Sequence, residues 1–277
     1  MSRINYSSLV RLGMEPPFRI FVRALLKHLN VSVKTRAVWE LSDRPAYLLG
    51  VLAAAEQALR QNISEISVIE FGVAGGNGLV ALQKEAEAVE KETGVGIKVY
   101  GFDMGPLGLP RFIGDHRDHP DIWKPGDYPM DVSKLQSRLD ERTTLILGNI
   151  EETVPEFFKK FQPPAIGFVS IDVDLYSSAR DALHLFTLAD KKMIWHVPLY
   201  FDDIEFIFNN KFAGELLAIN EFNKQNDHVK IDRWYGVKIG MPFPERYFLE
   251  KLYVAHDIEA ISKSDVNRQI VELPIIY

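Results

Sequence analysis

The sequence contains no cysteine among its 277 residues, which excludes disulfide bonds, thiol catalysis and thiolate metal sites. A metal ion could bind only to carboxylates, histidines or carbonyl oxygens. Long hydrophobic runs are also absent, because the most apolar stretch near the start, 47–55, ends at Glu56 and a membrane span needs about 20 residues. We therefore expect no transmembrane helix and, since the start shows no apolar export signal, a cytoplasmic protein.

Positive charge is in short supply, with 32 Lys and Arg against 38 Asp and Glu, for a net charge of −6. Such a chain repels phosphate unless a local basic patch overcomes the field, so we expect neither a nucleic-acid partner nor a membrane partner. Hydrophobic residues make up 47% and charged residues 25%. These fractions are typical of a packed globular protein.

From residue 67 the chain alternates between apolar strands and amphipathic helices. We predict strands at 67–72, 97–102, 143–147, 165–171 and 193–201, helices between them, and two late strands at 229–239 and 247–254. This alternation predicts an α/β fold with a doubly wound, mostly parallel sheet, whose ligands bind at the carboxyl ends of the strands. The segment 104–142 interrupts the alternation and is long enough to form a lid.

The first 62 residues read as a helical segment that precedes the α/β domain at 63–277. Within this segment, 18–29 forms a basic amphipathic helix with Arg19, Arg23 and Lys27 on one face. Packing on its own domain or on a sister subunit of a homo-oligomer is the simplest interpretation, and a membrane-surface role stays open.

A glycine-rich loop follows the first predicted strand, with Glu70 and Gly72 before it and Gly76 at its end. Glycines let the backbone turn sharply and approach a ligand closely. The dinucleotide fingerprint would require glycine where Ala74 and Asn77 stand, which disfavours a nicotinamide enzyme. A carboxylate beside the loop instead suits S-adenosylmethionine, whose sulfonium and amino groups are cationic.

Acidic residues close three of the predicted strands. Asp103 ends the second strand, where its carboxylate could accept hydrogen bonds from both ribose hydroxyls or simply cap a turn. Two further pairs, Asp172 with Asp174 and Asp202 with Asp203, end the fourth and fifth strands and should converge at one sheet edge. We expect the first pair to point to one side of an extended chain. Mg²⁺ would relieve the repulsion within this cluster, unless Lys or Arg side chains such as Arg180 neutralise it.

Five motifs in this order resemble the macrocin O-methyltransferase family of class I S-adenosylmethionine-dependent methyltransferases, which act on sugar hydroxyls of natural products. The matching stretches are 68–76, 102–103 with 108–110, 148–155, 171–178 and 201–203, within 67–222. The resemblance implies a Rossmann-like fold, an S-adenosylmethionine site at Glu70, Gly72, Gly76 and Asp103, and a hydroxyl acceptor. It also implies that Asp172, Asp202 and Asp203 hold Mg²⁺ and that Asp174 is the catalytic base.

Other polar residues leave alternatives open. The insertion carries His116 and His119 between aspartates. This pattern favours contact between a lid histidine and the substrate over a second metal site. A helix at 214–222 could present Glu215 to the site or to solvent. A non-catalytic S-adenosylmethionine-binding or assembly protein with the same fold is the alternative function, although such a protein would have no use for a repulsive carboxylate cluster.

Overall fold

A computed structural model describes residues 13–189, 192–205 and 210–264 of the chain. The predicted helical segment at 1–62 and the α/β domain at 63–277 therefore each extend beyond the described residues, into 1–12 and 265–277. The division at residue 62 stays a prediction, as does the role of the insertion as a lid.

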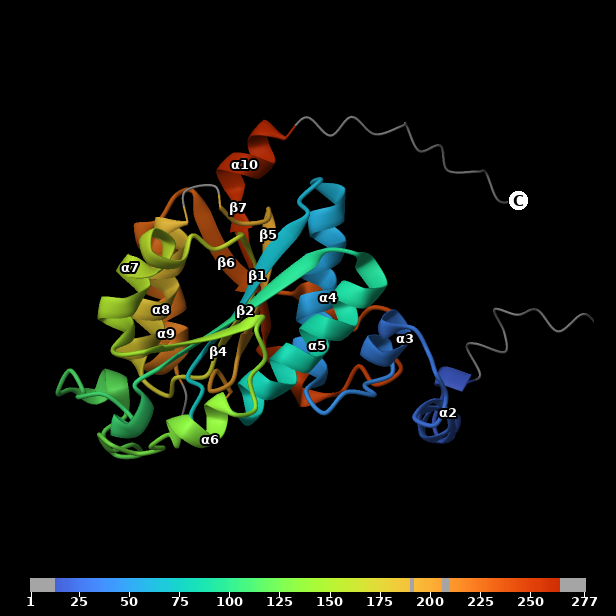
Figure 1. Cartoon of the computed structure of the whole chain (residues 1–277), viewed down its shortest axis with the longest axis horizontal. Coiled ribbons are helices and arrows are strands. Elements are labelled where there is room, and N and C mark those ends of the chain that lie inside the picture. Colours follow the sequence, from blue (N-terminus) through green and yellow to red (C-terminus); the bar gives the residue numbers. More distant parts are fainter. Residues whose placement is uncertain (1–12, 190–191, 206–209, 265–277) are drawn as a thin grey trace, which may run out of the picture.

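A seven-stranded sheet forms the centre of the molecule (Figure 1). The strand order is β3-β2-β1-β4-β5-β7-β6, and all pairs are parallel except those that β7 makes with β5 and β6. The strands are β1 (Glu65–Phe71), β2 (Gly96–Asp103), β3 (Thr143–Leu147), β4 (Ala165–Ile171), β5 (His196–Phe201), β6 (Val229–Arg233) and β7 (Leu252–Asp257). The predicted α/β fold with a doubly wound, mostly parallel sheet is confirmed.

Helices cover both faces of this sheet (Figure 1). One face carries α3 (Val33–Val38), α4 (Pro45–Arg60) and α5 (Asn77–Thr93), and the other carries α7 (Ile150–Phe161), α8 (Tyr176–Leu188) and α9 (Gly214–Gln225). Because both faces are covered, the central strands are mostly apolar, and β4 is buried from Ile166 to Ile171. Gly50 lets α4 approach closely, since a Cβ atom there would lie 2.3 Å from the Phe168 ring.

The amphipathic helix α2 (Phe18–Leu26) is fastened through its arginines rather than its apolar side. Arg19 binds the carboxylate of Glu245 at 2.7 Å, and Arg23 donates to the carbonyl oxygen of Glu40 at 2.8 Å. Phe21 and Leu25 are instead 69% and 61% exposed. The helix therefore contacts its own domain through its basic face, whereas its amphipathic pattern predicts packing through the apolar face.

The insertion between β2 and β3 contains three short helical turns: η1 (Gly105–Leu107), η2 (His116–Asp118) and α6 (Val132–Gln136). The chain after α9 also contains η3 (Tyr235–Lys238), η4 (Tyr247–Lys251) and, after β7, α10 (Ile258–Lys263). The predicted strands at 229–239 and 247–254 are therefore wrong in part, since one ends at Arg233 and the other begins at Leu252.

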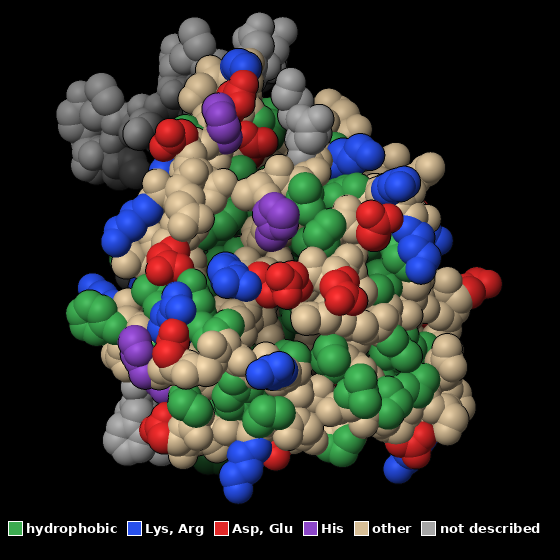
Figure 2. Space-filling view, turned by 90° about the vertical axis from the view of Figure 1, so that its left-hand side faces the viewer, with side chains coloured by type: hydrophobic (Ala, Val, Ile, Leu, Met, Phe, Trp, Pro, Cys, Tyr) green, Lys and Arg blue, Asp and Glu red, His purple; other side chains and the backbone are tan. Residues whose placement is uncertain are grey.

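No helix in the described part of the chain combines the length and the apolar character that a bilayer crossing requires. On the face formed by α7, α8 and α9, basic and acidic side chains are interspersed rather than gathered by sign (Figure 2). This face offers no basic stripe of the kind that binds a nucleic-acid backbone.

Candidate active site

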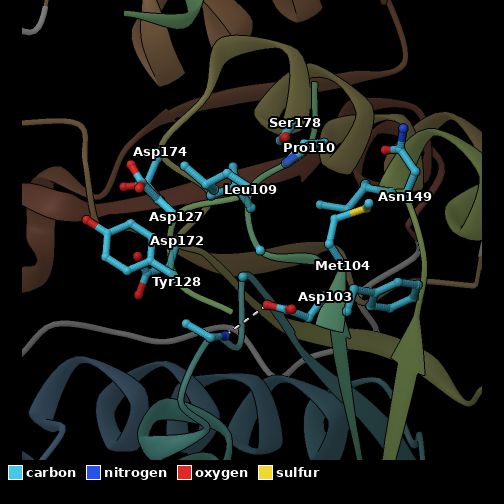
Figure 3. Close-up of a pocket in the computed structure, with 16 residues that line it drawn as sticks. Asp103, Met104, Leu109, Pro110, Asp127, Tyr128, Asn149, Asp172, Asp174 and Ser178 are labelled. Atoms are coloured by element: carbon cyan, nitrogen blue, oxygen red, sulfur yellow. Dashed lines mark hydrogen bonds between the residues drawn. The ribbon is translucent and has the colours of Figure 1, made fainter. Parts of the chain in front are cut away.

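Two adjoining cavities open at the carboxyl ends of β1, β2, β4 and β5, where the fold predicts a ligand site. We call them the Asp103 cavity and the acidic cavity. The Asp103 cavity is lined by Gly72, Ala74, Phe102, Asp103, Met104, Gly108, Leu109, Pro110, Asp127, Tyr128, Asn149, Ile150, Asp172, Val173, Asp174 and Ser178 (Figure 3). The acidic cavity is lined by Arg44, Glu70, Gly72, Val73, Ala74, Gly75, Asn77, Gly78, Trp123, Tyr128, Asp172, Asp174, Asp202 and Asp203.

Gly72 and Gly76 shape the loop between β1 and α5. Gly72 has φ +83°, and a Cβ atom on it would lie 1.7 Å from the carbonyl oxygen of Asp172. Only glycine fits this crossing of two backbones. Gly76 has φ +84°, and its Cβ would meet Leu135 of α6 at 2.2 Å. Of the two glycines, Gly72 lines both cavities, whereas Gly76 packs against α6 at the start of α5.

Glu70 lies behind the loop and is 1% exposed. Its Oε1 atom accepts a hydrogen bond from the Tyr47 hydroxyl at 2.6 Å, and this hydroxyl also accepts from Ser170 at 3.0 Å. Burial raises the pKa of Glu70 to about 8, although the Tyr47 hydrogen bond opposes the shift. A Cβ on Gly78 would lie 2.0 Å from Oε1, so the carboxyl group packs tightly under the first turn of α5.

Asp103, at the end of β2, holds the loop backbone. Its Oδ2 accepts the N–H groups of Val73 at 2.9 Å and Ala74 at 2.8 Å, and its Oδ1 accepts the N–H of Gly105 at 2.6 Å. Figure 3 shows the carboxylate at one end of its cavity, with Asp172, Asp174 and Tyr128 at the other. Asp103 therefore caps the backbone N–H groups of the loop, as one of the two sequence-based alternatives predicted. The carboxylate also faces the cavity in which a ribose could bind.

The four aspartates Asp172, Asp174, Asp202 and Asp203 do come together and line the acidic cavity. The backbone conformation that brings them together differs from the predicted extended strand. β4 ends at Ile171 and Asp174 has φ +61°, so the first pair does not continue an extended strand. Instead the Asp174 N–H donates to Oδ2 of Asp203 at 3.1 Å, which ties the loop after β4 to the loop after β5.

Burial and mutual repulsion disfavour charge on these aspartates. Burial is the main cause that raises the pKa of Asp172 to about 8, followed by Asp202 and Asp203. Burial and then Asp203 raise the pKa of Asp174 to about 8. For Asp203, burial and then Asp202 raise the pKa to about 6. The cluster therefore favours binding of either protons or a cation.

Two basic side chains already act on the cluster. Lys251 is 3% exposed, and its Nζ lies 3.1 Å from Oδ1 of Asp202. Arg44 lines the acidic cavity and interacts electrostatically with Asp172 and Asp202. Arg180, which the sequence suggested as the neutralising residue, instead binds its neighbour Asp181 at 2.8 Å.

The donor set of the acidic cavity matches Mg²⁺ in chemistry, because every candidate ligand is a carboxylate oxygen. As they stand, no three His, Asp or Glu side chains of the described residues are close enough together to hold a metal ion. A buried polar group nevertheless points to a missing partner: both carboxyl oxygens of Glu215 lack a hydrogen bond. The residues thus fit a hard cation in kind, and binding would have to draw them together.

The insertion is anchored by Asp118, which is fully buried. Its Oδ1 accepts the Ser177 N–H at 2.8 Å, and its Oδ2 accepts the Ile113 N–H at 2.9 Å. His116 and His119 line neither cavity within the described residues. Contact between these histidines and a substrate therefore has no support, and the insertion instead presents Trp123 and Tyr128 to the acidic cavity.

Sequence reasoning missed several residues of this site, among them Arg44, Trp123, Tyr128, Tyr200 and Lys251. Arg44 precedes the first turn of α4 and Lys251 ends η4, so neither adjoins a recognisable motif. Tyr200 gave the one usable signal, because it lies two residues before Asp202 on β5 and donates to its Oδ1 at 2.5 Å.

No protein-family model matches the sequence, and no curated protein matches it. Among solved structures, the O-methyltransferase NovP is 15% identical to the chain, covers 77% of it with 79% of its own length, and has a TM-score of 0.51. The calicheamicin methyltransferase CalS11 is 19% identical, with coverages of 80% and 90% and a TM-score of 0.49. At such low identity the likeness to NovP shows a shared fold. The chain therefore has the Rossmann-like α/β fold of class I methyltransferases.

Proposed function

We propose that this chain transfers a methyl group from S-adenosylmethionine to a hydroxyl of a small molecule, a sugar or another natural product. The observation that carries the proposal is the pair of adjoining cavities, which share Gly72, Asp172 and Asp174. The Asp103 cavity has apolar walls and the Asp103 carboxylate at one end, which suit an adenosine, and the acidic cavity has the carboxylates that suit deprotonation of a hydroxyl. The O-methyltransferase NovP, similar in fold, supports the same reaction class.

The cofactor residues of this proposal are Glu70, Gly72, Gly76 and Asp103. Gly72 allows close approach of the ligand to the loop, and Asp103 accepts hydrogen bonds from ribose hydroxyls while it holds the loop backbone. Glu70 acts from behind the loop, where it packs under the first turn of α5, and Gly76 acts through the packing of the loop against Leu135 of α6. S-adenosylmethionine supplies the electrophilic methyl group when it is bound.

The acceptor residues lie in the acidic cavity. Asp172, Asp202 and Asp203 would hold Mg²⁺, which when bound lowers the pKa of the acceptor hydroxyl. Asp174 takes the proton from that hydroxyl. Once ionised, a carboxylate whose burial raises its pKa to about 8 is a stronger base than an ordinary aspartate.

Calorimetric titration tests the cofactor part of the proposal. We expect S-adenosylhomocysteine to bind and NAD⁺ not to bind. Tight NAD⁺ binding with no response to S-adenosylhomocysteine would contradict a methyltransferase. The alternative, a protein that binds S-adenosylmethionine without catalysis, is distinguished by methyl transfer in a single turnover with a panel of sugar and phenolic hydroxyl acceptors. Full activity after chelation would overturn the Mg²⁺ part alone.

A further inference from the structure

Within the described part of the chain, Glu215 is a buried carboxyl group without a hydrogen-bond partner. It is the second residue of α9, its exposure is 0%, and neither Oε1 nor Oε2 has a hydrogen-bond partner. None of the ion pairs among the described residues includes it. Burial of such a group is costly unless something satisfies it.

The rest of the chain shows how buried glutamates are normally satisfied in this protein. Glu85, 2% exposed, accepts hydrogen bonds from Ser42 at 2.6 Å and from Arg36 at 3.3 Å. Glu40, 4% exposed, pairs with Arg246 at 2.8 Å. Against these two residues, Glu215 is an exception that calls for a ligand.

The surroundings of Glu215 identify the direction from which a ligand would come. After burial, the charges that act most strongly on it are those of Asp203, Asp172, Asp202 and Asp174, in that order. Glu215 does not itself line the acidic cavity. Its carboxyl group is therefore buried near the aspartates without forming part of the cavity surface.

One oxygen atom of the aspartate cluster already has partners. Oδ1 of Asp202 is bonded to the Tyr200 hydroxyl at 2.5 Å and to Lys251 Nζ at 3.1 Å. A divalent cation beside Asp202 would therefore either bind Oδ2 or compete with these two contacts. The unpartnered carboxyl group of Glu215 could supply a further oxygen ligand.

We propose that Glu215 is a further carboxylate ligand of a divalent cation in the acidic cavity, beside Asp172, Asp202 and Asp203. This inference rests on the metal part of the proposed function and adds a residue to it. It gives the unpartnered carboxyl group a counter-charge and explains why α9 begins with a buried acid. Hard oxygen ligands without nitrogen or sulfur select Mg²⁺ or Mn²⁺.

The experiment measures Mn²⁺ binding by electron paramagnetic resonance on the full chain without cofactor or acceptor. The variants are Glu215→Gln, Asp172→Asn and, as the matched control on the same helix, Glu221→Gln, because Glu221 binds Tyr176 at 2.5 Å on another side of α9. We expect Glu215→Gln and Asp172→Asn each to weaken Mn²⁺ binding at least tenfold. Glu221→Gln should stay within about twofold of the unaltered protein.

Each outcome decides a separate question. Loss of Mn²⁺ in Asp172→Asn with full retention in Glu215→Gln overturns the role of Glu215 and leaves the proposed metal site intact. Failure of the unaltered protein to bind Mn²⁺ removes the site altogether, while titration with S-adenosylhomocysteine still reports on the methyltransferase proposal. Equal loss in the Glu221→Gln control would show a general effect of α9 and also overturn the inference.

Thermal unfolding gives an independent readout that a purely structural role of Glu215 would not produce. Without metal, Glu215→Gln should unfold at a higher temperature than the unaltered protein, because a neutral amide replaces an unpaired acid. With Mn²⁺, the unaltered protein should gain more than the variant. An equal gain in both contradicts the inference. If the amide variant does not fold, Glu215→Asp keeps the charge one bond shorter, and its Mn²⁺ affinity should still fall.

Discussion

Lys251 and Asp202 form a buried contact between η4 and the end of β5. The lysine Nζ lies 3.1 Å from Oδ1 of Asp202 and also donates to its backbone carbonyl oxygen. The ammonium group lies 4.4 Å from the centre of the Tyr247 ring, which adds a cation–π contact. Lys251 is thus a built-in counter-charge for the aspartate cluster.

Replacement of Lys251 by Met should lower stability and raise metal affinity together. Removing one partner of a buried ion pair costs roughly 3–5 kcal/mol, and the partial exposure of Asp202 reduces our expectation to about 2 kcal/mol. Mn²⁺ should bind more tightly because a competing positive charge is gone. Urea unfolding and Mn²⁺ titration measure the two effects. Lys238→Met, which removes a partly exposed pair with Glu250, is the control and should change neither.

Two single variants, Asp172→Asn and Asp174→Asn, distinguish the proposed metal ligand from the proposed catalytic base. Asp172→Asn should lose metal affinity, whereas Asp174→Asn should keep the metal and lose turnover. Removal of a general base typically lowers the rate about 10²- to 10⁴-fold. Calorimetry with Mn²⁺ and single-turnover methyl transfer give the two readouts. Equal loss of metal in both variants would show that both are ligands.

Stability should fall as pH rises through the range in which Glu70 loses its proton. Its folded pKa of about 8 lies above the ordinary value of 4.5, so the native state binds this proton more tightly than the unfolded chain does. Its contribution is fully present below pH 4.5 and is lost as pH rises through 8, by up to about 1.4 kcal/mol per pH unit.

Glu70→Gln tests this directly, because an amide keeps the acceptor for Tyr47 without a titrating proton. Urea unfolding between pH 5 and 8 should show a smaller decline in the variant, while the exposed-side control Glu56→Gln should follow the unaltered protein. Identical pH profiles for Glu70→Gln and the unaltered protein would contradict the buried, protonated state.

Asp103→Ala should weaken binding of S-adenosylhomocysteine by roughly 1–3 kcal/mol, through lost charge-assisted hydrogen bonds. Because the carboxylate also holds the N–H groups of Val73 and Ala74, the variant should unfold more easily as well. Calorimetry and thermal unfolding separate the effects. Asp227→Asn, at an exposed position before β6, should leave both unchanged, and unaltered affinity in Asp103→Ala would exclude a role in the cofactor site.

The parallel half of the fold could be read from the sequence because its strands are buried on both faces. β3 and β4 have the predicted bounds, whereas β5 begins at His196 rather than at residue 193. Met193 instead forms an isolated bridge with Ile166. The antiparallel end was harder, since Tyr247 and its neighbours form a 3₁₀ turn, of which Leu249 is buried in the hydrophobic core. Apolar content alone does not distinguish such a turn from a strand.

The aspartates after β4 and β5 could be predicted as site residues because each pair directly follows an apolar strand, and this pattern is visible in the local sequence. The partners of these aspartates are set by tertiary packing. Lys251 contacts Asp202 although 49 residues of sequence separate the two. The sequence could not decide whether Glu215 faces the site or solvent, because α9 has acidic residues on more than one side. The left-handed backbone of Asp174 gave no signal, since aspartate adopts it more readily than most residues do.

The anchoring of the insertion by Asp118 has a practical consequence for engineering. A second anchor holds Gly126 and Asp127, which exchange backbone hydrogen bonds with Leu109. Between the two anchors, the segment 119–125 carries Trp123 to the acidic cavity. If the proposed function holds, exchanging this segment as one unit should change which acceptor fits, while the aspartates keep their places.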